Sequence, residues 1–322
     1  MTEMKKRAGI QFLCGLLVLI LCILTTATPA QAAVPKITAH ATVSNTMKLL
    51  KKYDADGYYL VDKAKGYGHS PADWISENDT VIDSINTIVH EECHANVYIG
   101  VTSYGTMKIY KGNGKYVTVN FDTDLFRTKK MASSIPKRLR TFRYGTYVKN
   151  DGKIPNLASD IQGAYGLLDE FTAYSWGLNN TVSLFDYYVS KAKGDFTKWA
   201  KFINHGANDR QAYAEFKYYI LHYLYFAKTN YPKVYKAFMN NANFKKAFKA
   251  VDKKYRSNIK KYNADLKKIR DILQSKGHTV SISGDYYYCD GYGIGTFKKD
   301  YDKLIKETNK TKYKKIYNKL IG

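Results

Sequence analysis

A long helical repeat in the second half of the chain constrains the fold more than any other feature. Apolar residues recur at spacings of three and four over about thirty residues that are otherwise rich in lysine. They are Phe244, Phe248, Val251, Tyr255, Ile259, Tyr262, Leu266, Ile269 and Leu273. The spacing predicts one amphipathic helix that ends near Gly277 and buries its apolar face against the rest of the protein.

The remaining periodicity predicts more helices and a few short strands. Helical patterns cover residues 44–52, 79–98, 157–176, 184–200, 208–229 and 298–320, and the fourth of these is interrupted near Gly194. Strand patterns cover residues 57–61, 107–110, 116–119, 279–283 and 285–297, the last four as two hairpins. The fold class we expect is therefore α+β and mostly helical, with small hairpins or sheets. We divide it into a body over 33–243 and a Lys-rich C-terminal subdomain over 244–322.

The N-terminus resembles an export signal. Lys5, Lys6 and Arg7 precede an apolar run over 12–24, and small residues lead up to Ala32. This order predicts a signal peptide over residues 1–32, cleaved after Ala32. The alternative is a retained membrane anchor, but the apolar run is short for a span. We expect a secreted, extracellular protein, with the cell wall as one place where it would remain.

The charge balance is strongly basic. The chain has 51 Lys+Arg against 28 Asp+Glu, a formal net charge of +23, and removal of the leader leaves about +21. This charge favours an anionic neighbour, such as a cell-wall polymer or a membrane surface, and export argues against nucleic acid. The alternative is a Lys-rich surface without a specific partner. The densest arginine cluster, from Lys129 to Arg143, either contacts an anionic substrate or forms a charged surface. We expect a monomer.

Two cysteines, Cys93 and Cys289, remain after removal of the leader. An exported chain with two cysteines has the option of one disulfide. The other option is two unpaired thiols, with Cys93 as a small core residue. The sequence leaves both open.

The strongest chemical signal is the stretch His90-Glu91-Glu92-Cys93-His94. On a helix, residues four apart point the same way, so both imidazoles face one point, as two zinc ligands would. Glu91 then lies within reach of a metal-bound water. The alternative is a solvated helix that carries two histidines. Glu92 falls on the apolar face, where a carboxylate needs a partner or a supporting role beside the metal.

At these residues the chain resembles the zincin metallopeptidases. The resemblance implies that His90 and His94 bind Zn²⁺, that Glu91 is the general base and that a third protein ligand lies elsewhere. In the gluzincin branch that ligand is a glutamate on a downstream helix, which here points to Glu170. Gluzincins often carry an acid four residues later to orient a histidine. Tyr174 stands there instead, to orient a histidine or to stabilise the oxyanion.

Other residues compete for these roles. Asp160 and Asp169 are rival third ligands, although Asp169 faces about 100° away from Glu170 on a helix. The metzincin pattern fails, because Val97 and Gly100 stand where a glycine and the third histidine are needed. For oxyanion stabilisation the further candidates are Tyr165, His205 and His222, and His69 is a loop histidine that would more often be solvated.

Together these observations predict a secreted zinc-dependent metallopeptidase that hydrolyses peptide or protein substrates with a zinc-activated water. One alternative is a non-catalytic basic protein that binds a cell wall or surface. Another is a zinc hydrolase that acts on a non-peptide bond. A structural zinc site needs no base, so the presence of Glu91 favours an enzyme.

Overall fold

The computed structural model describes residues 34–103, 105–121 and 125–322. The predicted signal peptide lies outside these residues, so secretion stays a prediction. Val34–Gly322 forms one compact unit. None of the helices in the described residues has the length and apolar character to cross a membrane.

The described chain is mostly helical, with two small antiparallel sheets, as the α+β prediction requires. The main α-helices are α1 (Val43–Tyr53), α2 (Ala55–Gly66), α3 (Val81–Tyr98), α6 (Ala164–Ser183), α7 (Phe185–Ala192), α8 (Phe196–Asn230), α9 (Pro232–Asn240), α10 (Ala242–Gln274), α11 (Lys298–Thr308) and α12 (Thr311–Ile321). Short helical turns are η1 (Pro71–Trp74), α4 (Lys129–Ala132), η2 (Lys137–Leu139), α5 (Ala158–Ile161) and the π-helix η3 (Gly145–Lys149).

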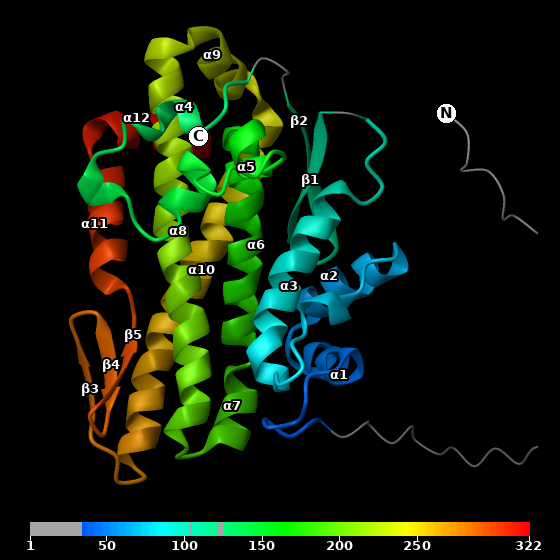
Figure 1. Ribbon diagram of the computed structural model, residues 1–322, viewed down its shortest axis with the longest axis vertical. Coiled ribbons are helices and arrows are strands. Elements are labelled where there is room, and N and C mark those ends of the chain that lie inside the picture. Colours follow the sequence, from blue (N-terminus) through cyan, green and yellow to red (C-terminus); the bar gives the residue numbers. More distant parts are fainter. Residues whose placement is uncertain (1–33, 104, 122–124) are drawn as a thin grey trace, which may run out of the picture. The chain divides into compact units, whose positions relative to one another are not determined.

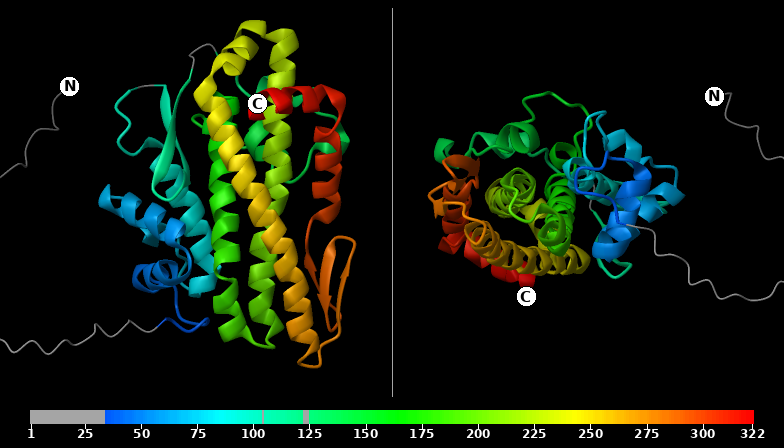
Figure 2. Two further views of the ribbon diagram at one scale, coloured as in Figure 1. Left: turned by 180° about the vertical axis from the view of Figure 1, so that it is seen from behind. Right: turned by 90° about the horizontal axis from the view of Figure 1, so that it is seen from below.

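Three long helices, α6, α8 and α10, run side by side and form the centre of the molecule (Figures 1 and 2). Of the 20 residues of α6, 17 are buried, as expected for a helix that has neighbours on all sides. α3 packs along another face of α6, with α1 and α2 outside it. All nine apolar residues predicted for α10 are buried, so this helix is confirmed. The predicted subdomain boundary at 243/244 falls within its first turn.

A glycine allows α8 and α10 to approach closely. A Cβ atom added to Gly206 would lie 2.1 Å from Cε2 of Tyr262, which no real side chain permits. The Tyr262 hydroxyl in turn donates to the carbonyl of Ile203, at 2.7 Å. Packing against Tyr262 thus explains why this glycine is tolerated in the middle of a long helix despite its low helix propensity.

The sheets are small and local. β1 (Thr106–Gly112) pairs with β2 (Lys115–Asn120) in the predicted hairpin, and this hairpin packs against α3 and α10. The second sheet has the order β3 (Val280–Ser283), β4 (Tyr286–Cys289) and β5 (Tyr292–Gly295). It lies beside one end of α10 (Figure 1).

The strand predicted over 57–61 is wrong, because this segment belongs to α2. The Asp54 side chain caps the helix by accepting from the Gly57 amide at 3.1 Å. Leu60 and Val61 are then buried from helical positions, so tertiary packing outweighs the β propensity of a Tyr-Tyr-Leu-Val run.

Two predicted helices are broken and two are joined. The helix over 157–176 is interrupted at Gly163, whose φ of 56° suits glycine, so α5 and α6 are separate. The helix over 298–320 divides into α11 and α12. The interruption predicted near Gly194 is confirmed, because α7 ends at Ala192 and α8 begins at Phe196. From there α8 runs without a break through 201–207, the segment between two predicted helices.

The cysteines are not linked. Cys93 and Cys289 are free thiols, and both are buried. The structure therefore matches the alternative of unpaired thiols and contradicts the disulfide. Burial raises the pKa of Cys93 well above its usual value, so its thiol is neutral in the core.

Candidate metal centre

A buried polar cluster holds the histidine helix in place. The Asn86 side-chain nitrogen donates to the Gly177 carbonyl of α6 at 2.8 Å and to Thr181 Oγ1 at 3.0 Å. It also lies 3.0 Å from Oδ2 of Asp209 on α8. Asn86 precedes His90 by about one helical turn. These bonds therefore fix α3 against both long helices next to the site.

The two histidines meet at their Nε2 atoms, which lie 3.2 Å apart. Two nitrogens that bind one tetrahedral zinc ion at about 2.0–2.1 Å are separated by about 3.3–3.4 Å. The observed distance fits this spacing. The side chain of His90 is almost fully buried, whereas that of His94 is 22 % exposed. The pair thus opens toward solvent on the His94 side.

Helix α6 brings two carboxylates to His94. Asp169 Oδ1 lies 2.8 Å from Nδ1, and Glu170 Oε2 lies 3.4 Å from Nε2. The short contact with Asp169 favours a proton on Nδ1, which leaves the Nε2 lone pair facing His90 and Glu170. Glu170 Oε2 is buried and accepts no hydrogen bond within the described part of the chain. His94 Nε2 therefore has two other possible zinc ligands next to it, His90 Nε2 and Glu170 Oε2.

The pKa values of the two histidines are shifted in opposite directions. Burial lowers the pKa of His94, but the charges of Asp169 and Glu170, together with the hydrogen bond to Asp169, outweigh it and hold this pKa well above the usual value. Burial, with His94 and Arg143 nearby, keeps the pKa of His90 well below its usual value. The site thus attracts one positive charge, which a proton or a metal ion can supply.

Glu91 completes the group. One of its carboxylate oxygens lies within 4.8 Å of the ligand nitrogens of both His90 and His94. Burial raises the pKa of Glu91; the charge of His94 opposes this shift and that of Glu170 adds to it. Glu91 faces a cleft whose other lining residues are His90, His94, Tyr98, Thr146, Tyr147, Ile154, Leu157, Ala158, Asp169 and Glu170. A carboxylate with a raised pKa beside such a cleft suits proton transfer.

Tyr174 lies behind His90. Its ring contacts the His90 ring edge-on, with centroids 4.3 Å apart, and its hydroxyl lies 3.3 Å from that of Tyr147. The Arg143 guanidinium lies 4.4 Å from the centre of the Tyr174 ring and forms a buried ion pair with Glu215 at 2.7 Å. Tyr174 therefore supports the His90 ring, while Tyr147 and Tyr98 are the tyrosines that line the cleft.

Three oxyanion candidates lie elsewhere. The Tyr165 ring packs on Phe238, with centroids 4.4 Å apart. His205 contacts the backbone of Ile82, about two turns before His90 along α3. His222 is buried, with Ser134 Oγ 2.8 Å from Nε2 and the Tyr313 hydroxyl 2.7 Å from Nδ1. These contacts make His222 a satisfied core histidine.

Two more predicted alternatives have other partners. Asp160 is buried and forms an ion pair with Arg127 at 2.8 Å, while the Lys129 amide also donates to it. Asp160 therefore pairs with Arg127 and Lys129 rather than with the two histidines. His69 is exposed in the loop after α2, as a solvated loop histidine would be.

Glu92 is a buried carboxylate on α3, at a position where the sequence predicted a partner or a supporting role beside the metal. It is 1 % exposed, and neither carboxylate oxygen has a well-formed hydrogen bond within the described residues. Burial raises the pKa of Glu92, and His69 and Trp74 only partly offset this effect. Burial thus disfavours the charged form of this carboxyl group.

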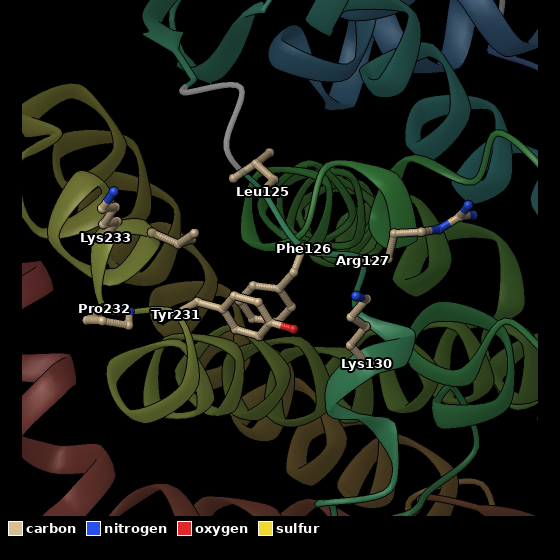
Figure 3. Close-up of a pocket in the computed structure, with 8 residues that line it drawn as sticks. Leu125, Phe126, Arg127, Lys130, Tyr231, Pro232 and Lys233 are labelled. Carbon is tan, nitrogen blue, oxygen red and sulfur yellow. The ribbon is translucent and has the colours of Figure 1, made fainter.

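A separate groove is lined by Phe126 and Tyr231, whose rings stack with centroids 4.3 Å apart (Figure 3). Its other lining residues are Leu125, Arg127, Lys130, Pro232, Lys233 and Val234. None of the lining residues is a histidine or an acid, so the groove offers no metal ligands of the kind found on α3.

Sequence reasoning missed three features of the site. It treated Asp169 only as a rival ligand and did not single out Tyr147. It also left Arg143 among surface charges, whereas Arg143 is buried. Only Asp169 had a usable signal, because it adjoins Glu170 on the same helix.

The comparisons with known proteins add no family to this description. No protein-family model, no curated protein and no solved structure matches the chain.

Proposed function

We propose that this protein is an exported zinc-dependent metallopeptidase with a zincin-like catalytic body. The observation that carries the proposal is the pair of contacts that His94 Nε2 makes, one with His90 Nε2 and one with Glu170 Oε2. These two distances, 3.2 Å and 3.4 Å, fit the separation of two ligand atoms in a tetrahedral zinc site. His90, His94 and Glu170 would hold the metal, and the fourth position would face the cleft.

The chemistry follows from these ligands and from Glu91. Zinc bound here would lower the pKa of a water and polarise the scissile carbonyl. Glu91 takes the proton of the attacking water and passes it to the leaving amine. Its raised pKa brings the carboxylate closer to the range in which it can accept and release a proton near neutral pH.

The surrounding residues position this group. Asp169 fixes the His94 ring through Nδ1, and Tyr174 supports the His90 ring. Tyr147 lines the cleft, and burial raises the pKa of its hydroxyl, so it stays a hydrogen-bond donor. We assign the oxyanion contact to Tyr147, with the peptide or protein substrate lying in the cleft beside it.

The test combines metal binding with cleavage of a peptide library by the purified protein. We expect the wild type to cleave and Glu91→Gln to retain zinc while losing at least a hundredfold in rate, because only the base is removed. Glu170→Ala should lose both zinc and cleavage. Cleavage that persists in Glu91→Gln, or its absence from zinc-loaded wild type, would contradict the proposal. Ester and other acyl substrates tested in parallel would reveal a zinc hydrolase of a non-peptide bond.

A second candidate function is adhesion to an anionic wall polymer or membrane surface. The observation that favours it is a line of exposed lysines on the solvent face of α10: Lys246, Lys249, Lys253, Lys260 and Lys267. Salt-dependent binding to anionic polymer or vesicles that survives Glu91→Gln would support this role. Replacement of these lysines by glutamine should then abolish binding without affecting zinc.

A further inference from the structure

A second group of metal-ligand types lies in the C-terminal sheet, on segments distinct from α3 and α6. His278 precedes β3, Cys289 ends β4 and Asp290 begins the turn to β5. One ligand atom from each of the three residues lies within 4.8 Å of the others. This cluster is independent of the proposed peptidase function.

Hydrogen bonds orient His278 toward the cluster. Its Nε2 lies 2.8 Å from the Gly194 carbonyl, so Nε2 carries the proton and donates. Nδ1 is hydrogen-bonded to Oδ2 of Asp290 at 2.6 Å, so a proton lies between these two atoms. A histidine that binds a metal through one nitrogen typically donates its other N–H to a carbonyl or carboxylate, which is the arrangement found here.

The carboxylate is also held in place. Asp290 Oδ1 accepts from the Thr279 amide at 2.8 Å, which leaves Oδ2 for the cluster. Asp290 has a φ of 50°, a conformation that only glycine, asparagine and aspartate adopt readily. The turn thus places the side chain of its first residue beside His278.

The third member is a buried thiol. Cys289 is 1 % exposed and free, on the same buried face of β4 as Tyr287. Tyr287 stacks on Phe196, the first residue of α8, with centroids 6.4 Å apart. The thiol therefore lies on the face of β4 that packs, through Tyr287, against the start of α8.

We propose that His278, Cys289 and Asp290 bind a zinc-like divalent cation through Nδ1, Sγ and Oδ2. A mixed set of thiolate, imidazole and carboxylate suits zinc better than calcium or magnesium, which prefer oxygen ligands alone. When the metal binds, the thiol proton and the proton between Nδ1 and Oδ2 leave. Nδ1 and Oδ2 then move apart from 2.6 Å to the separation of about 3.3 Å that two zinc ligands need. The fourth position, beside the exposed Asp290, is open to water. The bound ion ties the sheet to the α7–α8 connection through His278 and Gly194.

Cobalt(II) distinguishes this site from the one on α3. Cobalt bound to a thiolate gives a near-ultraviolet charge-transfer band, whereas the His90, His94 and Glu170 site contains no thiolate. We expect the full-length protein titrated with Co²⁺ to show this band, and Zn²⁺ to remove it. Cys93→Ala, the matched control for the other free thiol, should retain it.

Three variants test the ligands. Cys289→Ser should lose the band entirely. His278→Gln and Asp290→Asn should weaken Co²⁺ binding at least tenfold, and asparagine preserves the positive φ, so the turn itself is maintained. Far-ultraviolet circular dichroism checks that each variant is folded. No band in the wild type, a band that persists in Cys289→Ser, or its loss in Cys93→Ala would overturn the proposal.

Discussion

Asp169 Oδ1 lies 2.8 Å from His94 Nδ1, on the side of the imidazole ring opposite to the nitrogen that faces His90. Asp169 therefore orients the His94 ring, whereas its neighbour Glu170 is the expected metal ligand. Because Asp169 and Glu170 are neighbours on α6, one helix reaches both nitrogens of the same ring. This arrangement fixes the tautomer of His94 and supplies the negative charge that favours a cation at the site.

The contact between Asp169 and His94 predicts an effect on metal affinity. Asp169→Asn should lower the zinc affinity about 10- to 100-fold, because the amide orients the ring less well and adds no charge. A competitive zinc titration measures this change. The exposed Asp271→Asn is the matched control and should leave the affinity unchanged. An unaltered affinity in Asp169→Asn would show that the contact does not support metal binding.

The two tyrosines beside the site should differ in their effects. Tyr147→Phe should retain zinc and lower the rate of peptide cleavage about a hundredfold, since its hydroxyl is assigned to the oxyanion. Tyr174→Phe retains the ring that contacts His90, and it should have the smaller effect. Steady-state kinetics with zinc-loaded protein distinguish the two. A larger loss in Tyr174→Phe would return the oxyanion role to Tyr174.

Replacing only one partner of the buried Arg143–Glu215 ion pair should lower the stability of the fold strongly. Glu215 also accepts from the Arg143 amide at 3.0 Å and from Thr141 Oγ1 at 2.6 Å. Glu215→Gln or Arg143→Met should lower the free energy of unfolding by about 3–5 kcal/mol, because a buried charge is left unpaired. Chemical denaturation measures the loss. The exposed pair of Lys298 and Asp302 is the control, and Asp302→Asn should cost about 1 kcal/mol or less.

His222 predicts how stability depends on pH. Burial, with a smaller contribution from Lys312, lowers the pKa of His222 from 6.5 to about 4. The unfolded chain therefore binds the proton at a higher pH than the folded protein. The stability from neutral His222 is complete above pH 6.5 and declines as the pH falls toward 4, by on the order of 3 kcal/mol. Denaturation midpoints across this range should fall less steeply in His222→Gln, and equal slopes would contradict this assignment.

The sequence predicted the parts of the fold that depend on local periodicity. The apolar spacing of α10 and the alternation in β1 and β2 are confirmed because each records which face is buried. The segment 57–61 is a helix instead, because α2 is capped by Asp54 and packed against α3. Asp54 in turn accepts hydrogen bonds from Asn179 and Asn180, contacts more than 120 residues away that no local pattern contains.

The candidate site was predictable to a similar extent. The spacing of His90 and His94 indicated that both rings face one point, and the rings do meet there. The partners of these histidines come from α6 and from the segment around Tyr147, whose positions depend on how distant helices pack. The burial of Arg143 is likewise set by Glu215 on α8. A sequence pattern can indicate the donors of a metal centre, but tertiary contacts decide which neighbours orient them.

The most direct test of the central claim is the zinc content of the Cys289→Ser protein, in which the proposed thiolate site is removed. The account predicts one zinc ion per chain, and it predicts that adding His90→Ala to this protein removes that ion. A Cys289→Ser protein that is folded and takes up no zinc would contradict the assignment of His90, His94 and Glu170 as a metal centre, and adhesion to anionic surfaces would become the leading function.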